Sequence, residues 1–232
     1  MNKSIISVLN PNTRANSDEA FQKGGRWEKN KGRKQTRNFA KYFHKYISIP
    51  FKEFSVLDVG CALGDSIPIW HKHYPSAKLY GCDISEIAIK RCKESFGHIA
   101  NFFLASFEEI EGFWDIIYCS NVLEHFEEYI EIAQKLLFHC RVLYVMTPFA
   151  ELRDGNLLSL SPEHYHAASF FKNSFNRLVD VGNAKKIESK IFRCPGAWGL
   201  YKWQRARRLL PCIIFNRFIC MEPLQILYAI YK

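Results

Sequence analysis

The stretch Ser55-Val56-Leu57-Asp58-Val59-Gly60-Cys61-Ala62-Leu63-Gly64-Asp65-Ser66 decides the fold of this chain. It begins as a short apolar run, passes an aspartate and turns on the two glycines Gly60 and Gly64, after which a helical pattern begins. A buried parallel strand that leads into a helix through a glycine-rich turn is the usual cradle for a nucleotide-like cofactor. The free N–H groups at the start of such a helix point toward the ligand.

Strand-like and helix-like segments alternate around this stretch, and the sequence places them as follows. We expect strands at 55–59, 78–82, 101–105, 114–119, 141–146, 185–193 and 223–231, and helices at 32–47, 64–73, 85–96, 122–138 and 170–181. This alternation predicts an α/β fold with a parallel sheet and helices on both faces. Residues 1–32 are polar and contain Pro and Gly-Gly breakers, so we expect loose structure there.

Charge is distributed unevenly along the 232 residues. Residues 1–50, 51–182 and 183–232 carry formal charges of +8, −7 and +8, which together give the net +9. Basic flanks around an acidic centre favour an anionic substrate, nucleic acid or a membrane surface as partner. Solvated lysine-rich helix faces explain the same pattern equally well.

The eight cysteines contain no C-x-x-C pair, and several lie in apolar runs, as buried free thiols do. This usage indicates a reducing compartment, so we expect a cytoplasmic protein without structural zinc. The apolar patch before Asn10 is too short for a signal peptide, and no apolar run reaches the roughly 18 residues of a membrane span.

Two further positions fit a nucleotide-like cofactor. Asp83 ends the second expected strand, 19 residues after Gly64, where a carboxylate can accept hydrogen bonds from both ribose hydroxyls. A helix cap is the structural alternative for Asp83. The turn lacks the G-x-G-x-x-G of dinucleotide-binding folds, which argues against a nicotinamide-dependent oxidoreductase. Asp58, just before the turn, could receive an ammonium group.

Four motifs in this order and spacing resemble one enzyme family: Val56–Gly64, Tyr80–Asp83, Asp115–His125 and Val142–Pro148. Together they are similar to the class I S-adenosylmethionine-dependent methyltransferases, most closely the small-molecule type with Leu-Glu-His after strand four. The resemblance covers about residues 54–193 plus the final strand. It implies a Rossmann-like, mostly parallel sheet of seven strands with helices on both faces, in which the last strand is antiparallel.

The resemblance also implies roles for cofactor-binding residues, from the methionine portion of S-adenosyl-L-methionine to its adenine. Gly60, Cys61 and Gly64 would hold the methionine portion, with Asp58 near its ammonium and Asn121 near the methyl group. Asp83 would grip the ribose, with Ile84 beside the adenine and Ser106 and Phe107 in contact with it.

Two residues depart from the family pattern. Ala62 replaces the middle glycine of the usual turn, and Ser106 replaces the acid that usually binds adenine. A hydroxyl accepts a hydrogen bond less strongly than a carboxylate. These departures keep open a non-catalytic protein that binds the cofactor.

Methyl transfer from a sulfonium mainly requires alignment of the nucleophile and exclusion of water, and a hydroxyl nucleophile also needs a base. His125 follows the fourth expected strand, and His164 and His166 follow the fifth, so each is a candidate base. His125 could instead be a structural residue at a helix start. The pair His164 and His166 has no third ligand in view, so we predict no metal.

We expect an N-terminal basic helical cap over 1–50 and a methyltransferase domain over 51–232 with a lid insertion at 194–222. The candidate substrate or lid contacts are Trp27, Gln35, Trp198, Tyr201 and Trp203.

The acceptor that fits best is a small molecule or saccharide-like compound that is methylated on oxygen or nitrogen. The basic flanks are compatible with an anionic acceptor. RNA fits the charge but is less favoured, because the Asn/Asp-Pro-Pro-aromatic signature is missing after strand four. A membrane-linked acceptor would use the basic and then apolar segment 205–215, for which a packed lid or dimer contact is the alternative. The oligomeric state is not set by the sequence.

Overall fold

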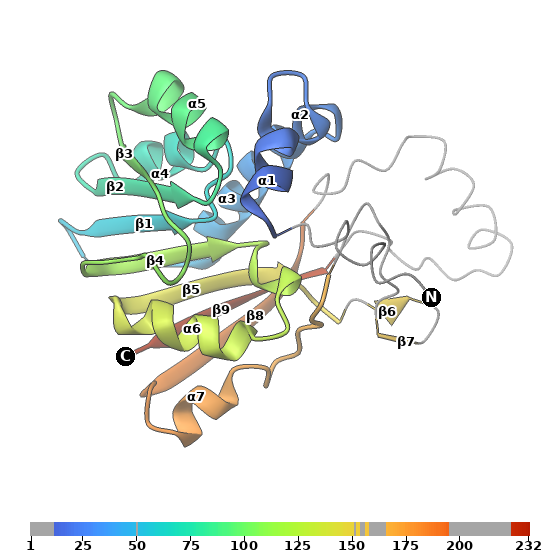
Figure 1. Ribbon diagram of the computed structural model, residues 1–232. Coiled ribbons are helices and arrows are strands. Elements are labelled where there is room, and N and C mark those ends of the chain that lie inside the picture. Colours follow the sequence, from blue (N-terminus) through green and yellow to red (C-terminus); the bar gives the residue numbers. More distant parts are fainter. Residues whose placement is uncertain (1–11, 50, 151, 154–155, 158–165, 195–223) are drawn as a thin grey trace, which may run out of the picture.

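A seven-stranded sheet forms the centre of the protein (Figure 1). The structure is a computed structural model, and it describes residues 12–49, 51–150, 152–153, 156–157, 166–194 and 224–232. The strand order is β3-β2-β1-β4-β5-β9-β8, and β9 runs antiparallel to both of its neighbours. The predicted α/β fold and its antiparallel last strand are therefore confirmed. The strands are β1 Ser55–Val59, β2 Lys78–Asp83, β3 Asn101–Leu104, β4 Trp114–Ser120, β5 Cys140–Pro148, β8 Lys186–Arg193 and β9 Leu224–Tyr231.

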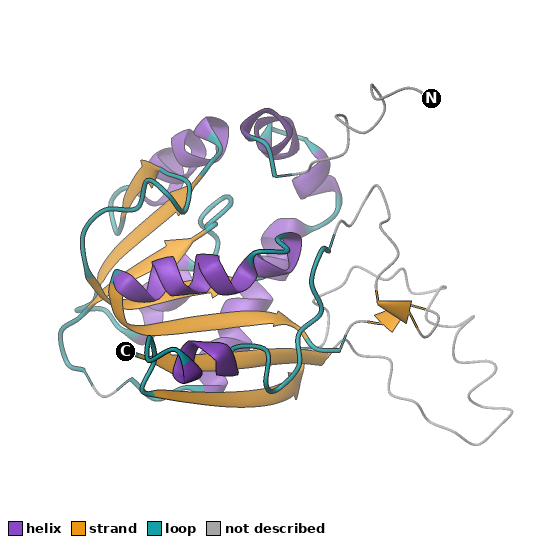
Figure 2. Ribbon diagram, turned by 60° about the horizontal axis from the view of Figure 1, so that its bottom comes forward, coloured by secondary structure: helices purple, strands orange, loops and turns teal. Residues whose placement is uncertain are grey.

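Helices cover both faces of the sheet (Figure 2). One face packs against α3 (Gly32–Tyr46), α4 (Ile67–His73) and α5 (Glu86–Phe96), and the other packs against α6 (Tyr129–Phe138) and α7 (Asn176–Asp180). Successive strand residues alternate between the two hydrophobic cores, because side chains in a strand point to opposite faces. Tyr118 belongs to the core under α3, and its neighbour Cys119 to the core under α6.

The parallel strands all end on the side of the molecule where α1 (Arg14–Phe21) lies (Figure 1). The small hairpin of β6 (Leu152–Arg153) and β7 (Asn156–Leu157) lies on this side too. Ligands of open α/β sheets bind in the crevice at the carboxyl ends of the strands. The fold therefore brings the N-terminal segment to the edge where a cofactor is expected.

The expectation of loose structure in residues 1–32 is wrong for the described part of that segment. Both α1 and α2 (Arg26–Lys29) are formed, and tertiary contacts hold them. Asp18 Oδ1 accepts hydrogen bonds from the Ser85 hydroxyl at 2.5 Å and from the Ile87 N–H at 3.2 Å. Arg91 donates to the Phe21 carbonyl oxygen at 2.8 Å. Local composition misses these contacts, because their partners lie about 70 residues away in the sequence.

The helix expected at 64–73 begins only at Ile67, and two other expected helices are also shorter than predicted. In place of a helix over 122–138, a single 3-10 turn at Leu123–His125 is followed by a loop, and α6 begins only at Tyr129. In place of a helix over 170–181, α7 begins at Asn176. Tertiary contacts override the helical pattern in both: Phe126 packs against Phe107, and Phe170 forms a β-bridge with Phe149. The first of these breaks shapes the site described below.

The described cysteines are all buried free thiols. Within the described ranges, no helix combines the length and the apolar character that crossing a membrane requires.

Candidate active site

The turn after β1 is a backbone cradle built from left-handed residues. Gly60 and Gly64 both have φ of +71°, and Ala62 between them has φ of +49°. A Cβ at Gly60 would lie 2.6 Å from Cγ2 of Val122, so only glycine fits there. An alanine in the left-handed region costs about 1–2 kcal/mol. The protein thus tolerates strain at Ala62 inside the turn expected to hold a cofactor.

Asp83 organises this cradle from the end of β2. Its Oδ2 accepts the Ala62 N–H at 2.9 Å, and its Oδ1 accepts the Ser85 N–H at 3.0 Å. Each carboxylate oxygen retains a second acceptor site, so these bonds leave capacity for two ribose hydroxyls. The structural role of Asp83 and the predicted ribose role are therefore compatible. Burial raises the pKa of Asp83 to about 6, although its backbone N–H donors act to lower it.

Asp58 is also buried, near the end of β1. Its Oδ2 accepts a hydrogen bond from the Ser66 hydroxyl. Burial raises the pKa of Asp58 to about 7, and the nearby Asp83 carboxylate adds to this shift. Two buried carboxyl groups with raised pKa values therefore lie near the carboxyl ends of neighbouring strands. Such a pair suits a ligand that carries positive charge.

The predicted adenine contacts lie along the neighbouring strand ends. Ile84 is half-buried directly after β2, and Ser106 follows β3. The Ser106 N–H donates to the Glu109 carboxylate at 2.8 Å. The ring of Phe107 meets Phe126 edge-to-face with centroids 5.2 Å apart, a contact the sequence interpretation missed. An apolar wall therefore stands next to the predicted adenine position.

Asn121 follows β4 in a left-handed conformation with φ of +55°. Its N–H donates to the Met146 carbonyl oxygen at 2.7 Å, which fixes the residue between β4 and β5. Its side-chain Oδ1 is buried and has no hydrogen-bond partner. A buried acceptor without a partner costs about 1–3 kcal/mol, so this atom fits a donor on a bound molecule.

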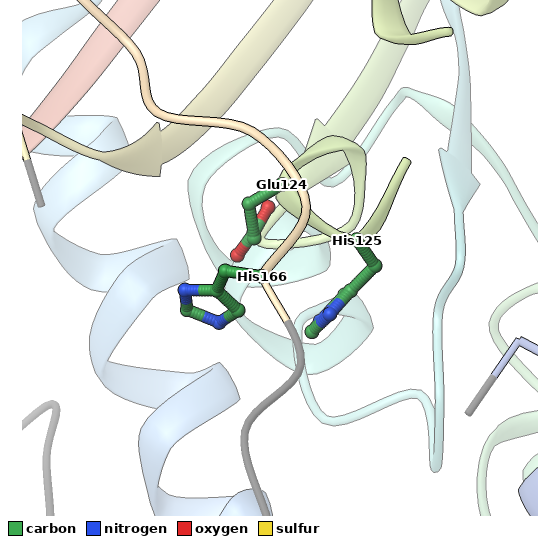
Figure 3. Close-up of side chains that lie close together, drawn as sticks. All are labelled: Glu124, His125 and His166. Atoms are coloured by element: carbon green, nitrogen blue, oxygen red, sulfur yellow. The ribbon is translucent and has the colours of Figure 1, made fainter. Parts of the chain in front are cut away.

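Glu124, His125 and His166 meet at the same strand edge (Figure 3). Their ligand atoms all lie within 4.8 Å of one another, and the two imidazole rings are 5.0 Å apart, edge to face. The Ala167 and Ala168 N–H groups both donate to the Glu124 carbonyl oxygen, which ties the second segment to the first. The structure therefore brings together two of the three predicted base candidates. The third candidate, His164, lies outside the described residues.

Glu124 was missed as a functional residue, although it belongs to the Leu-Glu-His motif. The prediction of no metal depended on the lack of a third ligand near the histidine pair. Glu124 supplies a third donor here, with His125 in place of His164. Only the fold shows this, because residues 124 and 166 are far apart in the sequence.

The predicted lid contacts divide between described and undescribed parts of the chain. The Trp27 ring packs directly on Gly32 and meets Phe21 edge-to-face at 5.4 Å, which joins α2 to α3. Gln35 lies at the end of the first turn of α3. Trp198, Tyr201 and Trp203 lie outside the described residues, as does the insertion 194–222 apart from buried Cys194.

The N-terminal segment crosses the strand edge between these groups. The Asn12 side-chain amide donates to the His125 carbonyl oxygen at 2.8 Å, and Asp18 caps the first turn of α5. We call residues 12–21 the N-terminal strap. It connects the turn that carries His125 with the helix that follows Asp83, so it spans the predicted cofactor position.

Comparison with known proteins identifies the family. A family model described as a methyltransferase domain matches residues 27–189. The chain belongs to this methyltransferase family. No curated protein sequence matches the chain.

Several solved methyltransferases share the fold of this methyltransferase. The plantazolicin methyltransferase BpumL, solved with a triazolic desmethylPZN analog and SAH, aligns with a TM-score of 0.58 and 19% identity over 100% of both chains. Magnesium protoporphyrin IX methyltransferase from Synechocystis PCC 6803, solved with SAM, aligns with a TM-score of 0.57 and 17% identity over 100% of this chain and 98% of that one.

A longer enzyme is also similar. Phosphoethanolamine N-methyltransferase 2 from Haemonchus contortus, solved with S-adenosyl-L-methionine, has a TM-score of 0.61 and 11% identity over 84% of this chain, but the match covers only 52% of that chain. The predicted methyltransferase is confirmed by the family match. The family uses S-adenosylmethionine, which confirms the predicted cofactor at the level of the family.

Proposed function

We propose that the protein transfers a methyl group from S-adenosylmethionine to an oxygen or nitrogen of a small-molecule or saccharide-like acceptor. The observation that carries this proposal is the cradle at the carboxyl edge, where the turn after β1, Asp83 and Asn121 converge. Gly60 allows close approach of a ligand to the backbone, and the buried Asn121 Oδ1 has a place for a donor. The cofactor supplies the electrophilic methyl group, and the chain supplies binding and orientation.

The residue roles follow from charge. The Asp58 and Asp83 carboxyl groups face a cofactor that carries an ammonium and a sulfonium, and a nearby cation favours their ionised forms. Asp83 receives the ribose hydroxyls, and Ile84, Ser106 and Phe107 border the adenine. The backbone of Gly60, Cys61 and Gly64 contacts the methionine portion.

A general base for a hydroxyl acceptor is available beside this position. His125 is half-buried and His166 is buried, and the nitrogen of a neutral imidazole can accept a proton from a hydroxyl group. The strap and α2 with Trp27 close the edge from the N-terminal side. We propose that residues 1–50 act as a cap on a domain formed by 51–232, with the insertion 194–222 as a lid.

We also propose that the acceptor is anionic. Fewer basic side chains can contact it than the composition indicates, because some of them pair with acidic groups of the protein. Arg33 donates to Asp65 at 2.9 Å and Arg37 pairs with Asp65 at 2.6 Å, so these arginines bind the domain itself. RNA and membrane-linked acceptors are the alternatives, and the segment 205–215 that would contact a membrane lies outside the described residues. The buried free thiols fit a reducing compartment such as the cytoplasm.

Calorimetry tests the cofactor assignment. We expect S-adenosylhomocysteine to bind and NAD not to bind, and the reverse result would refute the proposal. Asp83→Asn should weaken binding at least about tenfold, since one carboxylate acceptor for ribose is lost. Exposed Asp180→Asn is the matched control. Thermal unfolding of the ligand-free variants separates a lost ribose contact from a disturbed loop.

Transfer of labelled methyl tests the acceptor class. Incubation with labelled S-adenosylmethionine and separate pools of hydroxylated metabolites and sugars, RNA, or lipid vesicles should label only the small-molecule pool. Label in RNA or lipid alone would replace the proposed acceptor with an alternative. His125→Ala with full turnover would remove this residue from the base role.

A further inference from the structure

The structure assigns a divalent metal site to Glu124, His125 and His166 at the carboxyl edge of the sheet. The three residues offer one carboxylate oxygen and two imidazole nitrogens, and these atoms lie within 4.8 Å of one another (Figure 3). Ligand atoms on one tetrahedral ion lie about 3.4 Å apart, because each bond is about 2.0–2.2 Å long. Shifts of up to about 1 Å in each of the three side chains therefore bring all three atoms onto one ion.

The backbone holds the two ligand-bearing segments together before any ion binds. The Ala167 and Ala168 N–H groups donate to the Glu124 carbonyl oxygen at 2.6 and 3.1 Å. The Asn12 amide donates to the His125 carbonyl oxygen at 2.8 Å on the other side of the turn. Metal ligands bind best when surrounding hydrogen bonds fix their positions. This site has such support from three parts of the chain.

Burial and charge at the site also favour a cation. Glu124 and His166 are only 2% and 6% exposed, and a carboxylate buried to this degree is stabilised by a nearby cation. His125 is half-buried, which leaves a side from which an ion and a further ligand can enter. The exposed Glu127 and Glu128 follow His125 in the chain and add negative charge to this segment.

The donor set selects the class of ion. Imidazole ligands suit Zn²⁺, Fe²⁺, Cu²⁺ and Ni²⁺, whereas Mg²⁺ and Ca²⁺ prefer oxygen ligands. Three protein ligands leave open positions for an exogenous oxygen. A hydroxyl or carboxylate of the methyl acceptor could bind there, and the ion would lower the pKa of a hydroxyl. This role rests on the proposed function, and it makes the imidazoles ligands instead of bases.

Metal binding can be measured without cofactor or acceptor. The tag-free chain is stripped with a chelator and titrated with Co²⁺, and the visible absorption of the ion is recorded. We expect one equivalent to bind, Zn²⁺ to displace it, and Mg²⁺ at equal concentration to leave it bound. Glu124→Gln and His166→Gln should each weaken Co²⁺ binding at least tenfold. His139→Gln, at a surface histidine outside the site, should leave it unchanged.

Two results would overturn the site: no Co²⁺ binding by the intact chain, or unchanged binding in both Glu124→Gln and His166→Gln. Circular dichroism and thermal unfolding identify a variant that fails to fold, in which case His125→Gln replaces it. S-adenosylhomocysteine binding is measured on the same samples. If the intact chain binds Co²⁺ but not S-adenosylhomocysteine, the proposed function is refuted and the metal site is still supported.

Discussion

The charge state of Asp58 should affect both stability and cofactor binding. Its folded pKa of about 7 lies above the ordinary value of 3.8, because the carboxyl group is buried. Between these pH values the folded chain binds more protons than the unfolded chain. The free energy of unfolding of the ligand-free protein therefore falls as pH rises from about 4 to 7.

Asp58→Asn removes this penalty, because the amide cannot ionise. At pH 8 the free energy of unfolding of the variant should exceed that of the ligand-free parent by roughly 2–4 kcal/mol. At pH 4 the two values should be nearly equal. It should also bind S-adenosylhomocysteine at least about tenfold more weakly, because the ammonium loses its counter-charge. Urea denaturation at both pH values and calorimetry check this, and equal stability gains at the two pH values would contradict the assignment.

Gly60 tests whether the cradle needs open space as well as a left-handed backbone. Gly60→Ala places a methyl 2.6 Å from Val122 at φ of +71°. Gly182→Ala is the matched control, because its φ is +75° and nothing lies within 4 Å of the added methyl. Gly182→Ala should cost about 1 kcal/mol of stability and Gly60→Ala at least about 2–3 kcal/mol. Equal costs in chemical denaturation would show that Val122 moves aside freely.

The N-terminal strap is the element whose position depends on a few polar contacts. Arg91 on α5 holds it by a hydrogen bond to the Phe21 carbonyl oxygen, and Arg91 also holds the neighbouring α2 by an ion pair with Glu28 at 2.5 Å. These groups are partly buried, so their loss costs more than that of a surface pair. No residue of α1 is buried, so the strap can open without disturbing the sheet.

Arg91→Ala should therefore loosen the strap and leave the sheet intact. Hydrogen exchange should speed up by about tenfold in residues 12–30 and stay unchanged in β4, because local opening needs less free energy than global unfolding. Cofactor affinity should fall with it. Lys135→Ala is the control, since it breaks only an exposed pair with Glu108. Unchanged exchange in 12–30 would show that Arg91 does not hold the strap.

In the part of the chain that the structure describes, the seven-stranded sheet lies between two hydrophobic cores. Phe43 lies in the core under α3 and α4, Phe175 lies in the core under α6 and α7, and both are 0% exposed. Every strand of the sheet is hydrogen-bonded to its neighbours. We expect the two faces to unfold together, because neither core closes without the sheet.

Phe43→Ala and Phe175→Ala should each cost about 3–5 kcal/mol and lower the midpoint of one shared transition. Urea unfolding followed by tryptophan fluorescence and by far-ultraviolet circular dichroism should give coincident curves in both variants. S-adenosylhomocysteine at 100 times its dissociation constant should add about 2.7 kcal/mol to the parent. Separate transitions for the two probes would show that the faces unfold independently.

The sequence by itself predicted the seven strands of the main sheet, because most of them are short apolar runs and the strand at 186–193 alternates between apolar and polar residues. The pattern around Gly60 and Gly64 predicted the cradle, and the helix expected at 85–96 begins where the Ser85 hydroxyl accepts the Ala88 N–H at 3.0 Å. These features depend on neighbours within a few residues. Local chemistry is therefore enough to predict them.

Only the tertiary structure decided the N-terminal strap, the break between β4 and α6, and the meeting of Glu124 with His166. The partners of Asp18 and Asn12 are 67 and 113 residues away in the sequence. No local pattern encodes such a contact, because its free energy comes from packing that exists only in the folded chain. The family turn was readable from its residues, whereas the three-residue cluster beside it required the chain to fold.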